Sequence, residues 1–207
     1  MINNLRNKRV LITAGPTWVP IDIVRVISNV ASGETGILLA ERLSALGADV
    51  TLILGPVAAC CLAQKVRVIN FRFFDQLREM LKRELKSRRY DVIIHSAAVS
   101  DFKPKAFFKG KIDSDKTVLL ELEPLPKIIK DIRHLAPRAT LVMFKLEAGV
   151  SDNVLVRRAS KAKERSGADI AVANRLDPYR AFIIDKAGNI TAVKNKQELT
   201  KGLLSKL

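Results

Sequence analysis

The segment that decides the fold is RVLITAGPT, residues 9–17. Its first five residues form a short apolar run closed by a Gly-Pro turn, a pattern that predicts a buried β-strand. Similar runs predict four more central strands, at 49–54, 91–95, 140–145 and 168–173. The segments between them carry helical periodicity and helix-end signals, which predict helices at 33–46, 74–86, 124–135 and 153–166.

Strands separated by helices of this length predict an α/β fold with a doubly wound, mostly parallel, Rossmann-like sheet. The pattern changes near the carboxyl terminus, where 181–185 and 189–193 flank the turn KAG and predict a hairpin, followed by a helix at 196–207. We expect a single domain over residues 1–207. Because right-handed crossovers bring the strand carboxyl ends to one edge, the residues just after each strand are candidates for ligand binding.

The composition favours an anionic partner. The chain has 36 Lys and Arg against 21 Asp and Glu, a net charge of +15, which suits nucleic acid or small phosphorylated molecules equally well. The densest basic run, 82–89, is interpreted as the solvated end of a helix, since no aromatic residues interleave with it to stack bases. No apolar run approaches the roughly 20 residues that cross a bilayer, and no signal peptide pattern precedes the first strand. We therefore expect a cytoplasmic protein without a membrane partner.

Cysteine and histidine give no metal-binding pattern. Cys60 and Cys61 are adjacent and are interpreted as buried, inert thiols. His95 and His134 lie far apart, so a structural zinc site is not expected. His95 ends a predicted strand and is interpreted as a structural histidine, and Trp18 as a packing residue.

The first predicted strand leads into a long excursion instead of a helix, which resembles a split version of the glycine-rich dinucleotide turn. Gly15 permits a tight exit from the strand, and Gly33 lets backbone amides approach a phosphate at the helix amino terminus. Gly36 permits close helix packing, and Ser32 is predicted to be the N-cap, with a hydroxyl that can also donate to phosphate. An ordinary glycine-rich turn with a capped helix remains the alternative.

The excursion also places Arg25 a few residues before Asn29. A bidentate cation beside an amide suits a carboxylate or phosphate substrate. The alternative is that Arg25 is an ion-pair partner for Asp22.

At these residues the sequence resembles the phosphopantothenoylcysteine synthetase family. The similar segments follow four predicted strands in order: TAGPT at 13–17 with PID, VR, ISN, SG and G between 20 and 36; AAVSDF at 97–102; FKLE at 144–147; and AN at 173–174. In many bacteria this domain is the carboxyl-terminal half of a bifunctional enzyme whose other half is a flavin-dependent decarboxylase. We expect a stand-alone synthetase without flavin.

The resemblance implies a ligase of coenzyme A biosynthesis that joins L-cysteine to 4′-phosphopantothenate. The expected intermediate is an acyl-nucleotidylate, formed from CTP with Mg²⁺, and the expected products are 4′-phosphopantothenoylcysteine, CMP and pyrophosphate. ATP in place of CTP stays open. The resemblance also implies a homodimer, and no nucleic-acid partner is expected.

The resemblance implies roles for individual residues. Nucleotide-binding roles fall on Gly15, Ser32, Gly33, Ala97, Asp101 and Phe144. Phosphopantothenate-binding roles fall on Arg25, Asn29 and Ala98, and catalytic roles on Asn29 and Lys111. No metal ligands are identified.

Lys111 belongs to a lysine-rich segment at about 103–117, which is predicted to be a mobile flap over the site. Counting from Asp101 places the family's reactive flap lysine on Lys111, with Lys109 as the rival. Asp113 and Ser114 stand where the family has two further lysines, so the sequence departs from the motif there.

Two other functions are considered. An NAD(P)-dependent Rossmann-type reductase shares the sheet and the glycine-rich turn, but Gly55, Pro56 and Val57 after the second strand offer no ribose-binding side chain. A basic nucleic-acid-binding protein is favoured only by the net charge. Neither accounts for family motifs at four strand ends.

Overall fold

The computed structural model describes residues 5–58 and 65–207. Its centre is an eight-stranded sheet in the order β12-β11-β10-β9-β6-β1-β4-β5. The strands are β1 (Arg9–Ala14), β4 (Asp49–Leu54), β5 (Arg67–Asn70), β6 (Val92–His95), β9 (Thr140–Leu146), β10 (Ile170–Leu176), β11 (Tyr179–Ile184) and β12 (Ile190–Val193). All pairs from β5 to β10 are parallel, whereas β11 and β12 are antiparallel. This confirms the predicted mostly parallel α/β sheet with its carboxyl-terminal hairpin.

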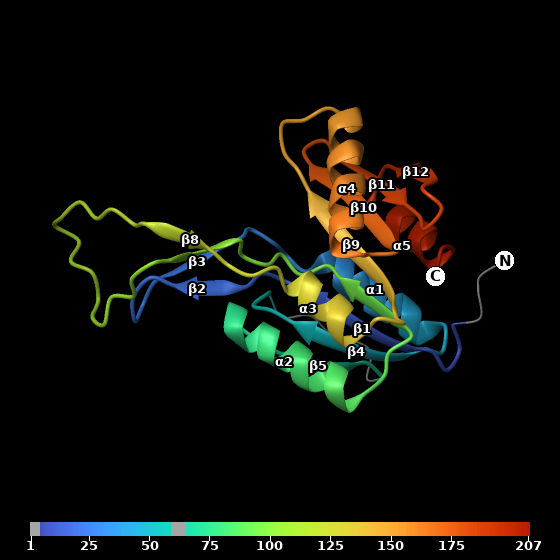
Figure 1. Cartoon of the computed structure of the whole chain (residues 1–207), viewed down its shortest axis with the longest axis horizontal. Helices are drawn as coiled ribbons and strands as arrows, with labels where there is room; N and C mark the ends of the chain where they lie inside the picture. Colours follow the sequence, from blue (N-terminus) through green and yellow to red (C-terminus); the bar gives the residue numbers. More distant parts are fainter. Residues whose placement is uncertain (1–4, 59–64) are drawn as a thin grey trace.

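Helices cover both faces of the sheet (Figure 1). They are α1 (Glu34–Ala45), α2 (Phe74–Ser87), α3 (Ile128–Leu135), α4 (Asp152–Ser166) and α5 (Lys196–Leu204). One buried cluster joins α1 and α5 to the sheet, and a second joins α2, α3 and α4 to the opposite face. The central strands are therefore buried on both sides, which is why apolar residues predominate along their length.

Besides the short strands of the arm described below, three elements differ from the sequence-based expectations. The helix expected from residue 124 begins only at Ile128, because residues up to Pro124 belong to a strand and Pro126 lies before the first helical turn. The last helix ends at Leu204. The short edge strand β5 was not predicted, because it is mostly exposed and lacks an apolar run.

The basic run at 82–89 is not wholly a solvated face. Glu84 within it is buried, and its carboxylate accepts hydrogen bonds from Arg67 at 2.6 Å and from the Tyr90 hydroxyl at 2.5 Å. Burial and this carboxylate raise the pKa of Tyr90 to about 12. The network fixes the end of α2 against β5.

Four short strands form an arm that projects from the sheet (Figure 1). β2 (Trp18–Pro20) pairs with β3 (Val26–Ser28), and β7 (Phe102–Pro104) pairs with β8 (Leu122–Pro124). The segment 105–121 between β7 and β8, the flap loop, lies at the far end of the arm. Two segments far apart in sequence, the excursion after β1 and the loop after β6, thus extend side by side.

Other expectations can be placed on this fold. Trp18 packs edge-on against Phe73, with ring centroids 6.2 Å apart, which supports a packing role. Cys60 and Cys61 lie outside the described residues. In the described part of the chain, every helix is too short or too polar to cross a bilayer.

Candidate functional site at the carboxyl edge of the sheet

The site lies where the strand order reverses. β1 stands between β4 and β6, and the chain runs first to β4 and only later returns to β6. Such a switch point leaves a crevice at the strand carboxyl ends, where ligands of α/β proteins bind. Here the hydrogen bonding between β1 and β6 continues beyond the ends of both strands. The Ala98 amide donates to the Gly15 carbonyl at 2.9 Å, and the Thr17 amide donates to the Ala98 carbonyl at 3.3 Å.

Helix α1 begins directly against the end of β1. Gly15 and Gly33 both have left-handed backbone, with φ of +79° and +71°, and a Cβ on Gly33 would lie 3.2 Å from the Gly15 nitrogen. A Cβ on Gly36 would lie 2.4 Å from the Ala14 Cβ, so only glycine permits this approach. The packing brings the unpaired amides and positive dipole end of α1 to the crevice, an arrangement that suits phosphate.

The prediction that Ser32 caps α1 is wrong. The N-cap residue is Gly33, and the exposed Ser32 hydroxyl lies 3.4 Å from the Glu34 amide, too far for a strong cap. The left-handed Gly33 turns the chain so that Ser32 stands outside the first turn. Its hydroxyl remains close to the helix amino end, while the Glu34 carboxylate pairs with Lys196 of α5.

Asn29 ties the end of the excursion to the loop after β6. Its side-chain amide donates to the carbonyls of Ala98 at 3.1 Å and Val99 at 3.2 Å. Beneath it, the buried Thr17 hydroxyl donates to the Ser100 hydroxyl at 2.9 Å and accepts from the Ser100 amide at 2.8 Å. Thr17 and Ser100 were missed by the sequence analysis, although each lies just past a strand end.

His95 is held inside the sheet, as its structural interpretation requires. Its Nδ1 is 2.8 Å from the Thr13 hydroxyl, and burial lowers its pKa to about 4. The ring is therefore neutral near pH 7, and its hydrogen-bonding partner belongs to β1.

The remaining strand-end residues occupy different environments. Ala97 is half-buried beside the second core cluster, and Phe144 is half-buried beside the α1 and α5 cluster. Asp101 is exposed and accepts a hydrogen bond from Lys127. Burial works against the charged form of Glu147, but Arg158 and Lys145 outweigh it and hold its pKa below its ordinary value.

The residue after β4 argues against a dinucleotide-type ribose site. A Cβ on Gly55 would lie 2.3 Å from the Pro16 carbonyl oxygen, so a side chain has no room there. The position that usually carries the acidic ribose ligand is thus filled by the backbone of the excursion.

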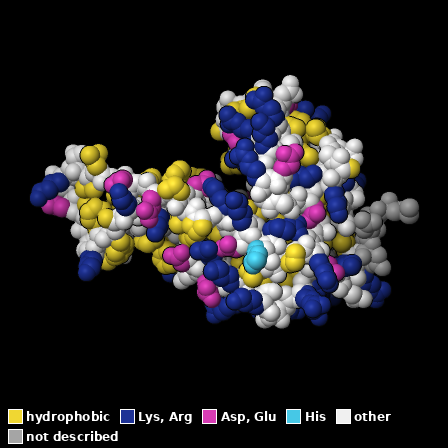
Figure 2. All heavy atoms as spheres, viewed as in Figure 1, with side chains coloured by type: hydrophobic (Ala, Val, Ile, Leu, Met, Phe, Trp, Pro, Cys, Tyr) yellow, Lys and Arg dark blue, Asp and Glu magenta, His cyan; other side chains and the backbone are white. Residues whose placement is uncertain are grey.

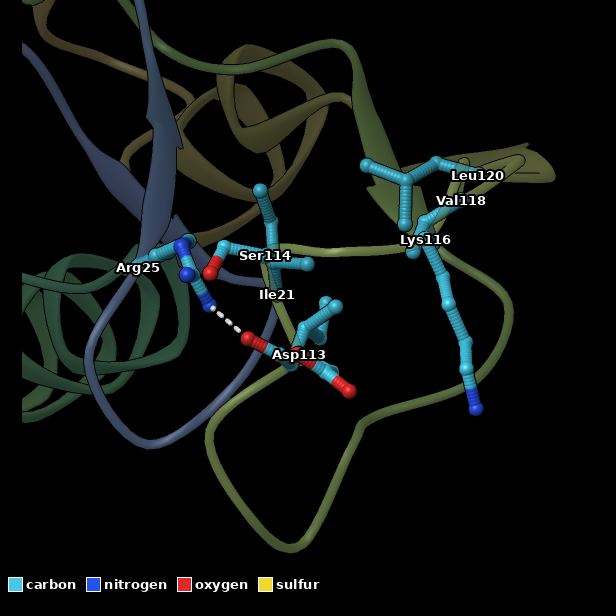
Figure 3. A pocket seen from close by; sticks show the side chains of 8 residues that line it. Ile21, Arg25, Asp113, Ser114, Lys116, Val118 and Leu120 are labelled. Atoms are coloured by element: carbon cyan, nitrogen blue, oxygen red, sulfur yellow. Dashed lines mark hydrogen bonds between the residues drawn. The ribbon is translucent and has the colours of Figure 1, made fainter.

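Arg25 and the flap lysines stand on the arm, apart from the strand-end cluster. Arg25 pairs with Asp22, as the alternative interpretation predicts, and its Nη1 also donates to the Ile112 carbonyl at 3.2 Å (Figure 3). Two flap-side lysines are paired across the β7–β8 ribbon, Lys103 with Glu123 and Lys105 with Glu121.

Three flap-loop lysines are different. Lys109, Lys111 and Lys116 are exposed and have no ion-pair partner among residues 5–58 and 65–207. The structure thus brings Gly15, Asn29, Gly33, Ala97 and Ala98 together at the switch point. It leaves Arg25 and Lys111 on the arm.

The chain matches, over residues 5–206, the family model described as the DNA/pantothenate metabolism flavoprotein C-terminal domain. It is 41% identical over 176 residues to the coenzyme A biosynthesis bifunctional protein CoaBC of Thermococcus kodakarensis, an alignment that covers 85% of this chain and 43% of that protein. It is 36% identical over 216 residues to a cysteine/cysteine sulfinic acid decarboxylase from an unknown prokaryotic organism, covering 98% of this chain and 58% of that protein.

The crystal structure of the DNA/pantothenate metabolism flavoprotein from Streptococcus pneumoniae has the same fold. It superposes with a TM-score of 0.86 at 28% identity, covering 96% of this chain and 97% of that one. The chain spans about half the length of the curated relatives it matches.

Proposed function

Since the chain belongs to the DNA/pantothenate metabolism flavoprotein C-terminal domain family, we propose that it is a ligase of coenzyme A biosynthesis that joins L-cysteine to 4′-phosphopantothenate with CTP. One observation carries the proposal. The amino end of α1, where Gly33 packs against Gly15, lies beside the Asn29–Ala98 contact at the sheet's switch point. A proposed phosphate cradle and the fixed side chain of Asn29 are thus adjacent, as joining a nucleotide to a carboxylate requires.

The proposed reaction has two steps. The substrate carboxylate attacks the α-phosphorus of the nucleotide, the bond to the β-phosphate oxygen breaks, and pyrophosphate leaves. The cysteine amine then attacks the acyl carbon of the mixed anhydride, loses a proton, and expels CMP. Little covalent chemistry falls to the protein, so positioning and charge neutralisation supply the catalysis.

Gly15, Ser32 and Gly33 are proposed to hold the phosphates through backbone amides and the Ser32 hydroxyl. Ala97, Asp101 and Phe144 are proposed to line the nucleotide pocket. Both N–H groups of Asn29 Nδ2 donate to the Ala98 and Val99 carbonyls, so its side-chain oxygen is held in place and is proposed to accept a hydrogen bond from an N–H of the acyl substrate without reorganisation. Ala98 and Arg25 are proposed to bind phosphopantothenate.

The flap loop is proposed to bring Lys111 to the reacting phosphate, where its charge stabilises the charge that develops on oxygen. Its ammonium group is exposed and available, in contrast to Lys103 and Lys105. The loop lies at the far end of the arm, so this role requires either closure of the arm or a second copy whose site it enters.

Mg²⁺ is proposed to enter with the nucleotide, bound mainly by phosphate oxygens. Within residues 5–58 and 65–207, no three His, Cys, Asp or Glu side chains converge into a metal-binding group. The protein's own carboxylates are therefore expected to contribute little to the first coordination sphere.

A homodimer is proposed from the exposed apolar surface of the arm. Val24 is 64% exposed, Phe107 53% and Leu119 91%, and several other apolar side chains of the arm share this exposure (Figure 2). Exposed apolar side chains gathered on one projecting element favour an interaction site, and a second copy would cover them. The reaction is proposed to take place in the cytoplasm.

Pyrophosphate release tests the first step. The chain is incubated with Mg²⁺ and CTP or ATP, with 4′-phosphopantothenate present or omitted and without cysteine. Release that needs phosphopantothenate, at an amount close to that of the enzyme, supports acyl-nucleotidylate formation. Absence of release with either nucleotide from folded protein refutes the proposal. The better nucleotide decides between CTP and ATP.

A further inference from the structure

Asp22 is a buried charged residue on the arm that the proposed chemistry does not use. Its side chain is 0% exposed, and a carboxylate in such a place needs compensating hydrogen bonds. Oδ1 accepts from the Val24 amide at 2.7 Å and the Arg25 amide at 2.6 Å. Oδ2 accepts from the Ile112 amide at 3.0 Å and from the Arg25 guanidinium.

The two oxygens of Asp22 therefore hold different segments. Oδ1 closes the turn between β2 and β3, whereas Oδ2 reaches a flap-loop residue 90 positions away in sequence. Arg25 strengthens the second connection, because its Nη1 also donates to the Ile112 carbonyl at 3.2 Å (Figure 3). The Phe108 amide adds a bond to the Ile21 carbonyl at 3.1 Å.

This connection fixes one flap lysine in particular. The amide that Asp22 binds belongs to the peptide between Lys111 and Ile112, so the backbone next to Lys111 is held directly. Burial disfavours the charged carboxylate, but the amides of Ile112, Val24 and Arg25 outweigh burial and keep the pKa of Asp22 well below its ordinary range. The connection is thus charged and intact at neutral pH.

We propose that Asp22 is a positioning residue that clamps the flap loop to the β2–β3 turn, so that Arg25 and Lys111 approach the substrate as one unit. The contacts of Asp22 are sufficient evidence for the clamp itself. Its consequence for catalysis rests on the proposed function. Lys111, and not Lys109, is the lysine that the clamp positions.

Asp22→Asn separates the two roles of the carboxylate. The amide oxygen can keep the Oδ1 bonds to Val24 and Arg25, so the turn is retained. The amide nitrogen then faces two donors, the Ile112 amide and the Arg25 guanidinium, and the clamp is lost. The matched control is Glu121→Gln, which removes the exposed ion pair with Lys105 on the same arm but leaves the clamp intact.

Limited trypsin digestion of the full chain, with cleavage sites mapped by mass spectrometry, measures the clamp without reference to activity. In the unsubstituted protein we expect slower cleavage after Lys111 than after Lys109 or Lys116. Asp22→Asn should raise cleavage after Lys111 by about tenfold or more, because two charge-assisted hydrogen bonds are lost. Glu121→Gln should not change it. Equal Lys111 cleavage in Asp22→Asn and the unsubstituted protein overturns the clamp.

Two further readouts complete the test. Amide hydrogen exchange in the unsubstituted chain should show Ile112 protected relative to its flap-loop neighbours, and equal exchange would contradict the clamp even if Asp22→Asn failed to fold. When cysteine is added to the pyrophosphate assay so that the enzyme turns over, Asp22→Asn should lower kcat about tenfold or more while KM for the nucleotide stays within about threefold. Parallel changes in both constants contradict the positioning role.

If the unsubstituted protein is inactive, the ligase proposal is refuted, while the trypsin result still decides whether the clamp exists.

Discussion

Gly36→Ala tests how closely α1 packs on β1. The added Cβ would lie 2.4 Å from the Ala14 Cβ and 2.8 Å from the Ser96 hydroxyl oxygen. Carbon atoms in ordinary contact are separated by roughly 3.5–4.0 Å, so α1 must move by about 1 Å or more. The neighbours are a strand residue and a hydroxyl that donates to the Thr13 carbonyl at 2.7 Å, and neither can easily give way.

The expected cost follows from two opposed effects. Alanine favours a helix over glycine by about 1 kcal/mol, whereas overpacking a rigid contact costs about 1–3 kcal/mol and occasionally more. Because the contact is so short, we expect Gly36→Ala to lower the free energy of unfolding by about 1–2 kcal/mol, and Tm by about 2–8 °C in a chain of this size. Nucleotide affinity should also fall, since the amino end of α1 moves away from Gly15.

The matched control is Gly202→Ala in α5. Its Cβ would meet the flexible end of the Ile183 side chain at 2.9 Å and would make an ordinary contact with Val193 at 3.8 Å. We expect this variant to be neutral or slightly stabilised. Urea unfolding and thermal denaturation of both variants provide the measurement. A Gly36→Ala variant as stable as the unsubstituted chain, with unchanged nucleotide binding, would refute the close approach of α1 to β1.

The remaining predictions concern a buried histidine, a buried carboxylate and the flap. The pKa of His95 is about 4 in the folded state against 6.5 in the unfolded state, so its contribution to the free energy of unfolding is complete above pH 6.5 and is lost as the pH falls toward 4. Urea unfolding measured across this pH range should show a loss of about 3 kcal/mol that is absent in His95→Gln. Glu84→Ala leaves the buried Tyr90 hydroxyl without its carboxylate acceptor and should cost about 3 kcal/mol in urea unfolding, so a loss below about 1 kcal/mol would contradict the network. Lys111→Ala should reduce kcat for pyrophosphate release about 100-fold, and Lys109→Ala should have a much smaller effect; the reverse order would assign the role to Lys109.

The central sheet could be predicted because its strands are buried on both faces. In β1, β4 and β6 apolar residues predominate, interrupted only by Thr13 and Thr51, and each run ends at a glycine or a polar residue. The edge strand β5 is exposed along most of its length and has only two consecutive apolar residues, so no run marks it. The arm escaped prediction for a related reason, since β2, β3, β7 and β8 have only three residues each, too few for a strand pattern to be recognised.

The candidate site shows the same division. The positions of Gly15 and Ala98 could be predicted because parallel strands deliver their carboxyl ends to one edge, and that of Gly33 because it begins the next predicted helix. The capping role of Ser32 could not be judged from residue type, because the left-handed backbone of Gly33 decides which residue begins α1. The flap clamp was not predictable either, since Asp22 and Ile112 are brought together only by the pairing of the arm.

The most direct test of the ligase is the stoichiometry of the complete reaction. Purified chain, Mg²⁺, CTP, 4′-phosphopantothenate and cysteine are incubated together, and the products are quantified by mass spectrometry. The proposed function predicts 4′-phosphopantothenoylcysteine and CMP in equal amounts, with neither formed when phosphopantothenate is omitted. The absence of the ligated product from folded, nucleotide-binding protein, with ATP also tried, would contradict it.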